Sequence, residues 1–116
     1  PIIAAPDEIY LELGRGANRV RIPVDFAGVT VCAVGRGDER EPVALDLTPY
    51  GAFDYGVSRR HALLTAQREG VYVKDLGSTN GTRINGFSLA PERAYRLRNG
   101  DELEFGRLRL VVRFVK

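Results

Sequence analysis

Three short segments of this 116-residue chain carry side chains suited to binding an anion. Residues 34–37 place Arg36 between two glycines, which leave its guanidinium unhindered and let the backbone approach a ligand. Residues 57–61 put a hydroxyl and two guanidiniums just before an apolar run, and residues 76–86 are rich in hydroxyls and Asn-Gly pairs. If these segments converge, they offer charge-assisted donors without a carboxylate, which is what a phosphate ester requires.

The same residues also fit ordinary hairpin turns. Ser, Thr, Asn and Gly are the residue types that turns need, because they tolerate turn conformations and bond locally to the backbone. Composition alone therefore leaves both interpretations open, an anion site and a set of polar turns.

The elements that must position these segments are short strands. Apolar and polar residues alternate along most of the chain, as in residues 107–114, where every second side chain is apolar. Asn-Gly pairs at residues 80–81, 85–86 and 99–100 favour tight turns, because both residues tolerate positive φ. Eleven strands are expected, at residues 9–13, 19–24, 29–34, 43–47, 61–67, 71–76, 82–85, 87–90, 93–97, 102–105 and 107–114. This pattern predicts an all-β sandwich of two antiparallel sheets without helices.

Length and composition favour one soluble domain over residues 1–116, with a core over about residues 8–115. No stretch approaches the roughly 20 apolar residues of a membrane-spanning helix, and residues 1–6 lack the basic head and continuous apolar body expected of a secretory signal. The chain contains no Met, so we expect a module cut from a longer protein. Cys32 is the only cysteine, so an internal disulfide and a zinc site built from thiolates are excluded. A single cysteine also favours a cytoplasmic location, and we interpret Cys32 as a core filler.

The net charge of +2 argues against nucleic acid as a partner. Arginines at positions 19, 21, 107, 109 and 113 alternate with apolar residues and are interpreted as solvated strand faces. Glu102 and Glu104 alternate in the same way, so we do not interpret them as a catalytic carboxylate pair.

A nucleophilic triad of Ser58, His61 and Asp75 is the enzymatic alternative. Ser58 does not lie in the strand-to-helix elbow that exposes a hydrolase nucleophile, and nothing identifies an oxyanion hole. We therefore expect a binding module rather than an enzyme, with no cofactor and no metal.

Five segments, taken in order, resemble the signature of the forkhead-associated (FHA) domain family. They are Gly35-Arg36, Ser58-Arg59-Arg60-His61, the run from Leu76 to Thr82, Ile84-Asn85-Gly86, and Asn99-Gly100-Asp101 through Phe105-Gly106. The resemblance implies an eleven-stranded β-sandwich (FHA/SMAD-like) that binds phosphothreonine peptides through loops at one end. It implies a monomeric module of Ser/Thr-kinase signalling, whose partner is a phosphothreonine-containing protein and not a membrane.

Carried over by position, the resemblance assigns roles to five residues. Arg36 and Ser58 are expected to contact the phosphate directly, and Arg59 is expected to lie against it. Thr79 matches the hydroxyl that reaches the phosphate from the third loop, and Asn80 matches the amide that clamps the peptide backbone.

Other matching positions are expected to support the loops. His61 and Asn85 correspond to residues that brace loops without touching ligand, whereas the role of Arg60 stays open. The main rival function within the resemblance is docking of a protein independently of phosphate, through a sheet face.

The chain departs from the family between Arg36 and Ser58, where the separation is longer than usual. Residues 48–56 in this stretch contain Tyr50, Phe53 and Tyr55. These aromatics are either plugs of the core or the lining of a peptide groove that selects an apolar residue near the phosphothreonine. The sequence leaves both interpretations open.

Overall fold

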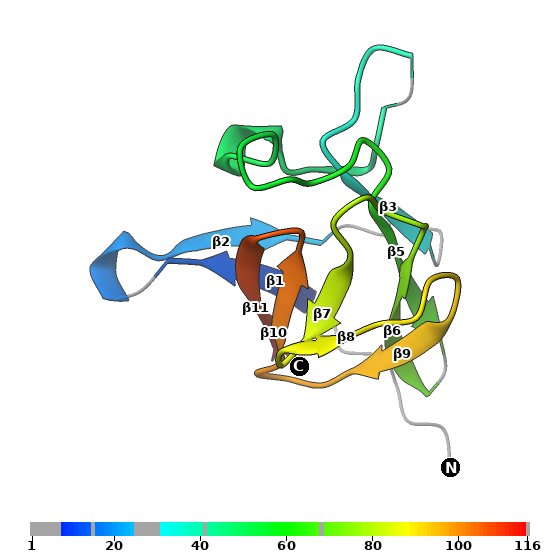
Figure 1. Cartoon of the computed structure of the whole chain (residues 1–116). Coiled ribbons are helices and arrows are strands. Elements are labelled where there is room, and N and C mark those ends of the chain that lie inside the picture. The colour runs from blue at the N-terminus through cyan, green and yellow to red at the C-terminus, as the bar shows by residue number, and fades with distance from the viewer. Residues whose placement is uncertain (1–7, 15, 25–30, 41, 68, 116) are drawn as a thin grey trace.

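The computed structural model describes residues 8–14, 16–24, 31–40, 42–67 and 69–115, without the side chains of residues 31–33. Within these residues eleven strands form two sheets that face each other (Figure 1). The strands are β1 (Glu8–Leu13), β2 (Val20–Pro23), β3 (Val31–Gly35), β4 (Leu45–Asp46), β5 (Ala62–Gln67), β6 (Gly70–Asp75), β7 (Thr82–Ile84), β8 (Phe87–Ser88), β9 (Ala94–Leu97), β10 (Glu102–Phe105) and β11 (Leu108–Val115). Two single turns of 3₁₀ helix, η1 (Gly16–Asn18) and η2 (Thr48–Tyr50), interrupt the connections.

One sheet has the order β2-β1-β11-β10-β7-β8 and the other has the order β4-β3-β5-β6-β9. The all-β sandwich expected from the sequence is confirmed. Among the described residues, neighbouring strands are antiparallel with one exception. The two-residue strand β4 runs parallel to β3. The loop between β3 and β4 carries the chain back before β4 pairs, so Leu45 lies opposite Val34.

Alternating apolar residues fill the space between the sheets. In β11 the side chains of Leu108, Leu110 and Val112 are buried, while Arg109 and Arg113 on the opposite face are exposed. Successive side chains of a strand point to opposite faces, so each strand contributes every second residue to the core. Full burial of one Leu or Val side chain stabilises the fold by about 1.5–3 kcal/mol.

Several strands are shorter than the alternation suggested. The predicted strands at residues 43–47 and 87–90 are reduced to β4 and β8, each two residues long. Leu47 and Leu89 lie outside these strands but are nonetheless buried. These apolar residues therefore contact the core without taking part in strand pairing. Residues 29 and 30 of the third predicted strand and the side chain of Cys32 lie outside the described part of the structure.

The outer face of the six-stranded sheet is organised around Glu12, which is only 4% exposed. Its carboxylate lies 3.3 Å from Nε of Arg19, 3.3 Å from Nε of Arg21 and 2.6 Å from Nε of Arg113. The hydrogen bond from Arg113 holds the pKa of Glu12 below its ordinary value. Arg21 and Arg113 lie on a strand face, as predicted, whereas Arg19 lies just before β2, and all three cover a carboxylate.

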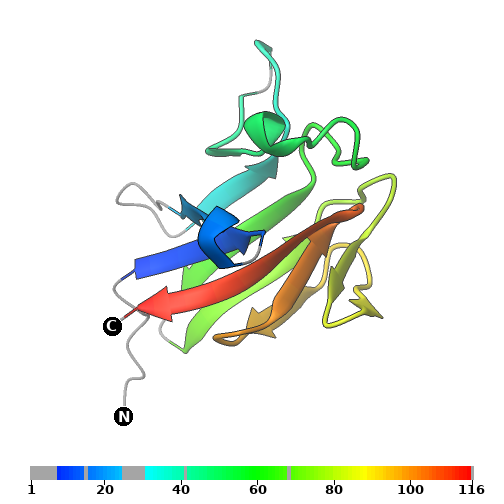
Figure 2. The ribbon, with the colours of Figure 1, turned by 90° about the vertical axis from the view of Figure 1, so that its left-hand side faces the viewer.

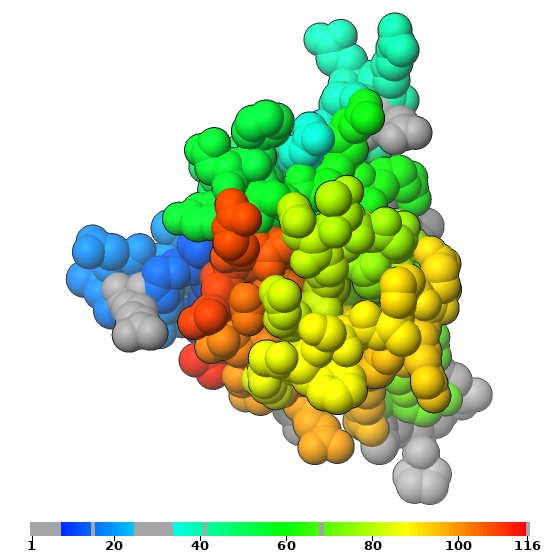
Figure 3. Space-filling model, viewed as in Figure 1, coloured from blue at the N-terminus to red at the C-terminus, as the bar shows by residue number. Residues whose placement is uncertain are grey.

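The loops that carry the predicted site gather at one end of the sandwich (Figure 2). They are the β3–β4 loop (residues 36–44), the β4–β5 segment (residues 47–61) and the β6–β7 loop (residues 76–81). The β10–β11 turn (residues 106–107) lies against them, because Gly106 N–H donates to Gly81 O and Arg107 N–H donates to Tyr55 O. The cyan β3–β4 loop projects furthest from this end in the space-filling view (Figure 3).

Candidate functional site

Backbone contacts fix the β3–β4 loop against the end of the β4–β5 segment. Arg36 N–H donates to Ser58 O at 3.2 Å, and Gly37 N–H donates to Arg59 O at 3.0 Å. A Cβ atom at Gly35 would lie 2.2 Å from Arg59 O, so only glycine allows this approach. The glycine before Arg36 therefore brings the first two predicted segments into contact.

The side chain of Arg36 is partly buried and held from two sides. Its Nε donates to the carbonyl of Val57 at 2.9 Å, and its guanidinium carbon lies 5.4 Å from the centre of the Phe53 ring. Both contacts limit the rotamers of a long side chain, so the cation is positioned before any ligand binds.

Ser58 links two of the loops. Its Oγ accepts a hydrogen bond from Thr79 N–H at 3.2 Å, which leaves the hydroxyl hydrogen available to a further acceptor. Its backbone N–H donates to Nδ1 of His61 at 3.0 Å. Thr79 itself is exposed at the tip of the β6–β7 loop.

His61 is fully buried beneath this link and braces both loops. Because Nδ1 accepts from Ser58, the hydrogen is assigned to Nε2, which donates to the carbonyl of Gly81 at 2.9 Å. Burial lowers the pKa of His61, and the imidazole packs edge-on against Phe105 with ring centres 5.4 Å apart. The imidazole is therefore neutral at neutral pH.

Asp75, at the end of β6, organises the β6–β7 loop. Its carboxylate accepts hydrogen bonds from the N–H groups of Gly77 and Ser78 and from the hydroxyls of Ser78 and Thr82. Burial acts to raise the pKa of Asp75, but these hydrogen bonds outweigh burial, so the pKa lies below its ordinary value. Asp75 shapes the loop that carries Thr79.

Asn80 and Arg59 complete the cluster at the loop end. Asn80 Nδ2 donates to the carbonyl of Gly56 at 3.0 Å, which ties the β6–β7 loop to the β4–β5 segment. Arg59 is 58% exposed and pairs with the carboxylate of Asp38 at 3.1 Å. The sequence did not suggest the pair of Arg59 and Asp38. The cluster holds the carboxylate of Asp38, although no carboxylate was expected there.

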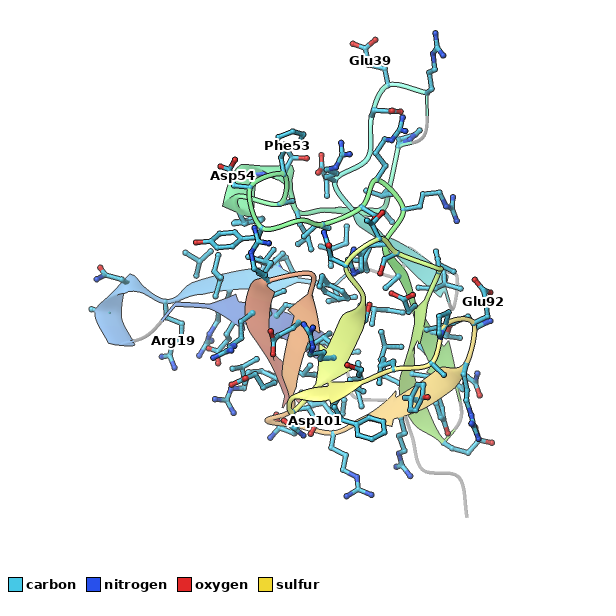
Figure 4. All side chains as sticks on the ribbon, in the orientation of Figure 1. Arg19, Glu39, Phe53, Asp54, Glu92 and Asp101 are labelled. Carbon is cyan, nitrogen blue, oxygen red and sulfur yellow. The ribbon has the colours of Figure 1, made fainter. Side chains whose placement is uncertain are left out.

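Asn85 lies elsewhere. It occupies the turn after β7, at the opposite end of that strand from Gly81, with a positive φ of 51°. Its Nδ2 donates to Asp101 at 3.0 Å, and its Oδ1 accepts from Glu102 N–H at 2.8 Å. Asn85 therefore braces the β7–β8 turn against the start of β10, far from the other predicted residues. Its partner Asp101 is labelled in Figure 4.

The triad arrangement of Ser58, His61 and Asp75 does not form. His61 bonds to the backbone N–H of Ser58 and not to its hydroxyl. Asp75 lies 4.0 Å from Nε2 of His61, which instead faces Gly81. A nucleophilic serine needs a base bonded to its hydroxyl and a carboxylate that orients this base. The Ser58 hydroxyl has no such base, and His61 has no carboxylate that orients Nδ1.

Among the residues that the structure describes, no three His, Cys, Asp or Glu side chains come close enough together to hold a metal ion. No helix in that part of the chain has the length and apolar character needed to cross a membrane.

The fold and the site together define a β-sandwich module whose loops at one end gather arginines, hydroxyls and an amide. The FHA domain family model matches residues 32–106, and the chain belongs to this family. The family resemblance noted in the sequence is thereby confirmed.

Among similar proteins, the glycogen accumulation regulator GarA of Mycobacterium tuberculosis is 43% identical over 107 residues, covering 91% of this chain and 57% of the regulator. Protein FraH of Nostoc is 35% identical over 83 residues, covering 72% of this chain and 28% of FraH. The chain thus spans less than two thirds of either relative. A solved structure from a study of phosphothreonine-dependent FHA domain interactions is 26% identical, covers 94% of this chain and 98% of that chain, and superposes with a TM-score of 0.70.

Proposed function

We propose that this domain binds phosphothreonine-containing peptides and proteins in Ser/Thr-kinase signalling, as a monomeric, non-enzymatic module of the cytoplasm. In this proposal the phosphate lies against Arg36 and Ser58, with Arg59 beside it and the Thr79 hydroxyl reaching it from the β6–β7 loop. Asn80 holds the peptide backbone next to the phosphothreonine.

The observation that carries the proposal is the hydrogen bond from Thr79 N–H to Ser58 Oγ, next to the guanidinium of Arg36. Arg36 is bonded to the carbonyl of Val57, the residue before Ser58, so a cation and two hydroxyl residues lie at one place. A phosphate dianion has three acceptor oxygens and is stabilised by several charge-assisted donors.

Asn80 fits its proposed role because its amide is already oriented. One Nδ2 hydrogen is bonded to the carbonyl of Gly56. The carbonyl oxygen and second hydrogen of the same amide are the groups proposed to pair with a peptide N–H and a peptide C=O.

An oriented phosphothreonine peptide library tests the proposal, with unphosphorylated and Glu-substituted libraries as controls. Only the phosphothreonine peptides are expected to bind, because a carboxylate offers about one charge and two oxygens where the phosphate offers nearly two charges and three oxygens. Equal binding of the Glu peptides would contradict dianion recognition. Equal binding of the unphosphorylated peptides would instead support docking that is independent of phosphate.

A further inference from the structure

Phe53 presents an unusually exposed aromatic ring directly beside the proposed phosphate anchor. The residue, which is labelled in Figure 4, is 74% exposed. Its ring centre lies 5.4 Å from the guanidinium carbon of Arg36. A Phe side chain exposed to this degree contributes little to the core, and it leaves apolar surface in contact with water.

The segment that carries Phe53 is firmly attached to the sandwich. Its residues Ala52 and Val57 are 0% and 2% exposed, and Val57 N–H donates to Ala52 O at 2.9 Å. At its start, Thr48 Oγ1 donates to the carbonyl of Arg36 at 2.8 Å. The fold therefore holds the backbone that carries Phe53 beside the same arginine that is proposed to bind phosphate.

The other two aromatics of this segment have different surroundings. Tyr50 is partly buried and packs against the core. Tyr55 is 47% exposed and, together with Tyr50, lines a shallow cavity of about 350 Å³ next to Leu13 and Arg107. Of the three, Phe53 is the most exposed and is the aromatic that contacts Arg36.

We propose that Phe53 determines sequence specificity by selecting an apolar or aromatic peptide residue close to the phosphothreonine. This inference rests on the proposed function. An extended peptide advances about 3.3 Å per residue, so a ring next to the phosphate anchor lies within reach of residues up to about two positions from the phosphothreonine. An apolar side chain at such a position covers the exposed ring face, whereas a charged side chain would lose hydration there.

The test uses phosphothreonine peptides in which each of the two positions on either side of the phosphothreonine is in turn Ala, Leu, Phe or Glu. Dissociation constants are measured for the wild type, Phe53→Ala and Phe87→Ala. Phe87 is the matched control, because it is 65% exposed but follows the β7–β8 turn at the opposite end of the molecule. Melting temperatures of all three proteins verify that the fold is intact.

The wild type and Phe87→Ala are expected to prefer Leu or Phe over Ala by about fivefold at one of these positions, and Phe53→Ala is expected to lose that preference. A preference that survives in Phe53→Ala, or a wild type without one, overturns the inference while phosphothreonine binding stands. Loss of binding to every peptide in Phe53→Ala also overturns it, because the ring would then position Arg36 and not select a residue. Failure of the wild type to bind any of the peptides contradicts the proposed function itself.

Discussion

The hydroxyl oxygen of Ser58 accepts a hydrogen bond from the backbone N–H of Thr79 at 3.2 Å, across 21 residues of sequence. This contact joins the end of the β4–β5 segment to the β6–β7 loop at the point where both offer hydroxyl groups. The neutral imidazole of His61 supports it from below by bonding to Ser58 N–H and to Gly81 O. A ligand that binds here meets donors already positioned by the fold, which reduces the ordering cost of binding.

Replacing Arg36 by Ala is expected to weaken phosphothreonine peptide binding by about 2–5 kcal/mol, because a charged partner of the phosphate is lost. Unfolding stability is expected to fall by only about 1 kcal/mol, through loss of the bond from Nε to Val57 O. Titration calorimetry and urea denaturation measure the two effects. Arg98→Ala removes the same charge from an exposed position in the β9–β10 turn and should bind normally. Wild-type affinity in Arg36→Ala would refute the assignment of Arg36 as the anchor.

Asp38→Asn is expected to bind phosphothreonine peptides more tightly than the wild type. The carboxylate of Asp38 pairs with Arg59 and repels a dianion that shares this cation. Both partners are solvent-accessible, so we expect a gain of at most about fivefold, which shrinks as salt screens the charges. Glu39→Gln removes a charge from the neighbouring exposed residue and should change affinity less. Weaker binding in Asp38→Asn would mean that Asp38 orients Arg59 for the ligand.

Asp75→Ala is expected to lower the free energy of unfolding by about 3 kcal/mol, because buried and partly buried donors lose their acceptor. The loss should appear as a lower urea midpoint with an unchanged m-value. Asp54→Ala is the control, since Asp54 is exposed in the β4–β5 segment. A loss below about 1 kcal/mol would show that the β6–β7 loop does not depend on this carboxylate.

Stability is expected to fall between pH 7 and pH 5 because of His61. Burial lowers the pKa of His61 in the folded state, so below the ordinary value of about 6.5 the unfolded chain binds a proton that the folded chain does not. Asp75, whose folded pKa is also lowered, adds a further loss only as pH falls below its ordinary value of about 3.9. Urea midpoints at several pH values measure the slope. His61 is the only histidine, so His61→Gln should reduce the slope, and an unchanged slope would contradict this origin.

The sequence predicted the fold and the loop positions well, because alternation and Asn-Gly pairs are local signals. It also located Arg36 and Ser58 in segments that the structure brings together. The parallel pairing of β4 was not predictable, since a strand of two residues carries no alternation.

The residues that sequence reasoning missed act through distant contacts. Asp75 occupies a strand end, where sequence alone suggests only a triad member, although the residue holds the β6–β7 loop. Asp38 stands two residues after Arg36, but its pairing with Arg59 depends on how two loops meet. The three aromatics of residues 48–56 could not be distinguished by sequence, because burial of Tyr50 and exposure of Phe53 are set by tertiary packing.

The most direct test of the central claim is a titration of the ¹⁵N-labelled domain with a binding phosphothreonine peptide, followed by amide chemical shifts. The unphosphorylated peptide is the control. We expect the largest shifts at the amides of Arg36, Gly37, Ser58, Arg59, Thr79 and Asn80. Small shifts are expected at Asn85 and Asp101, which lie at the far end of β7 and β10. Shifts centred on the β2-β1-β11 face, or equal shifts with the unphosphorylated peptide, would contradict phosphate recognition by these loops.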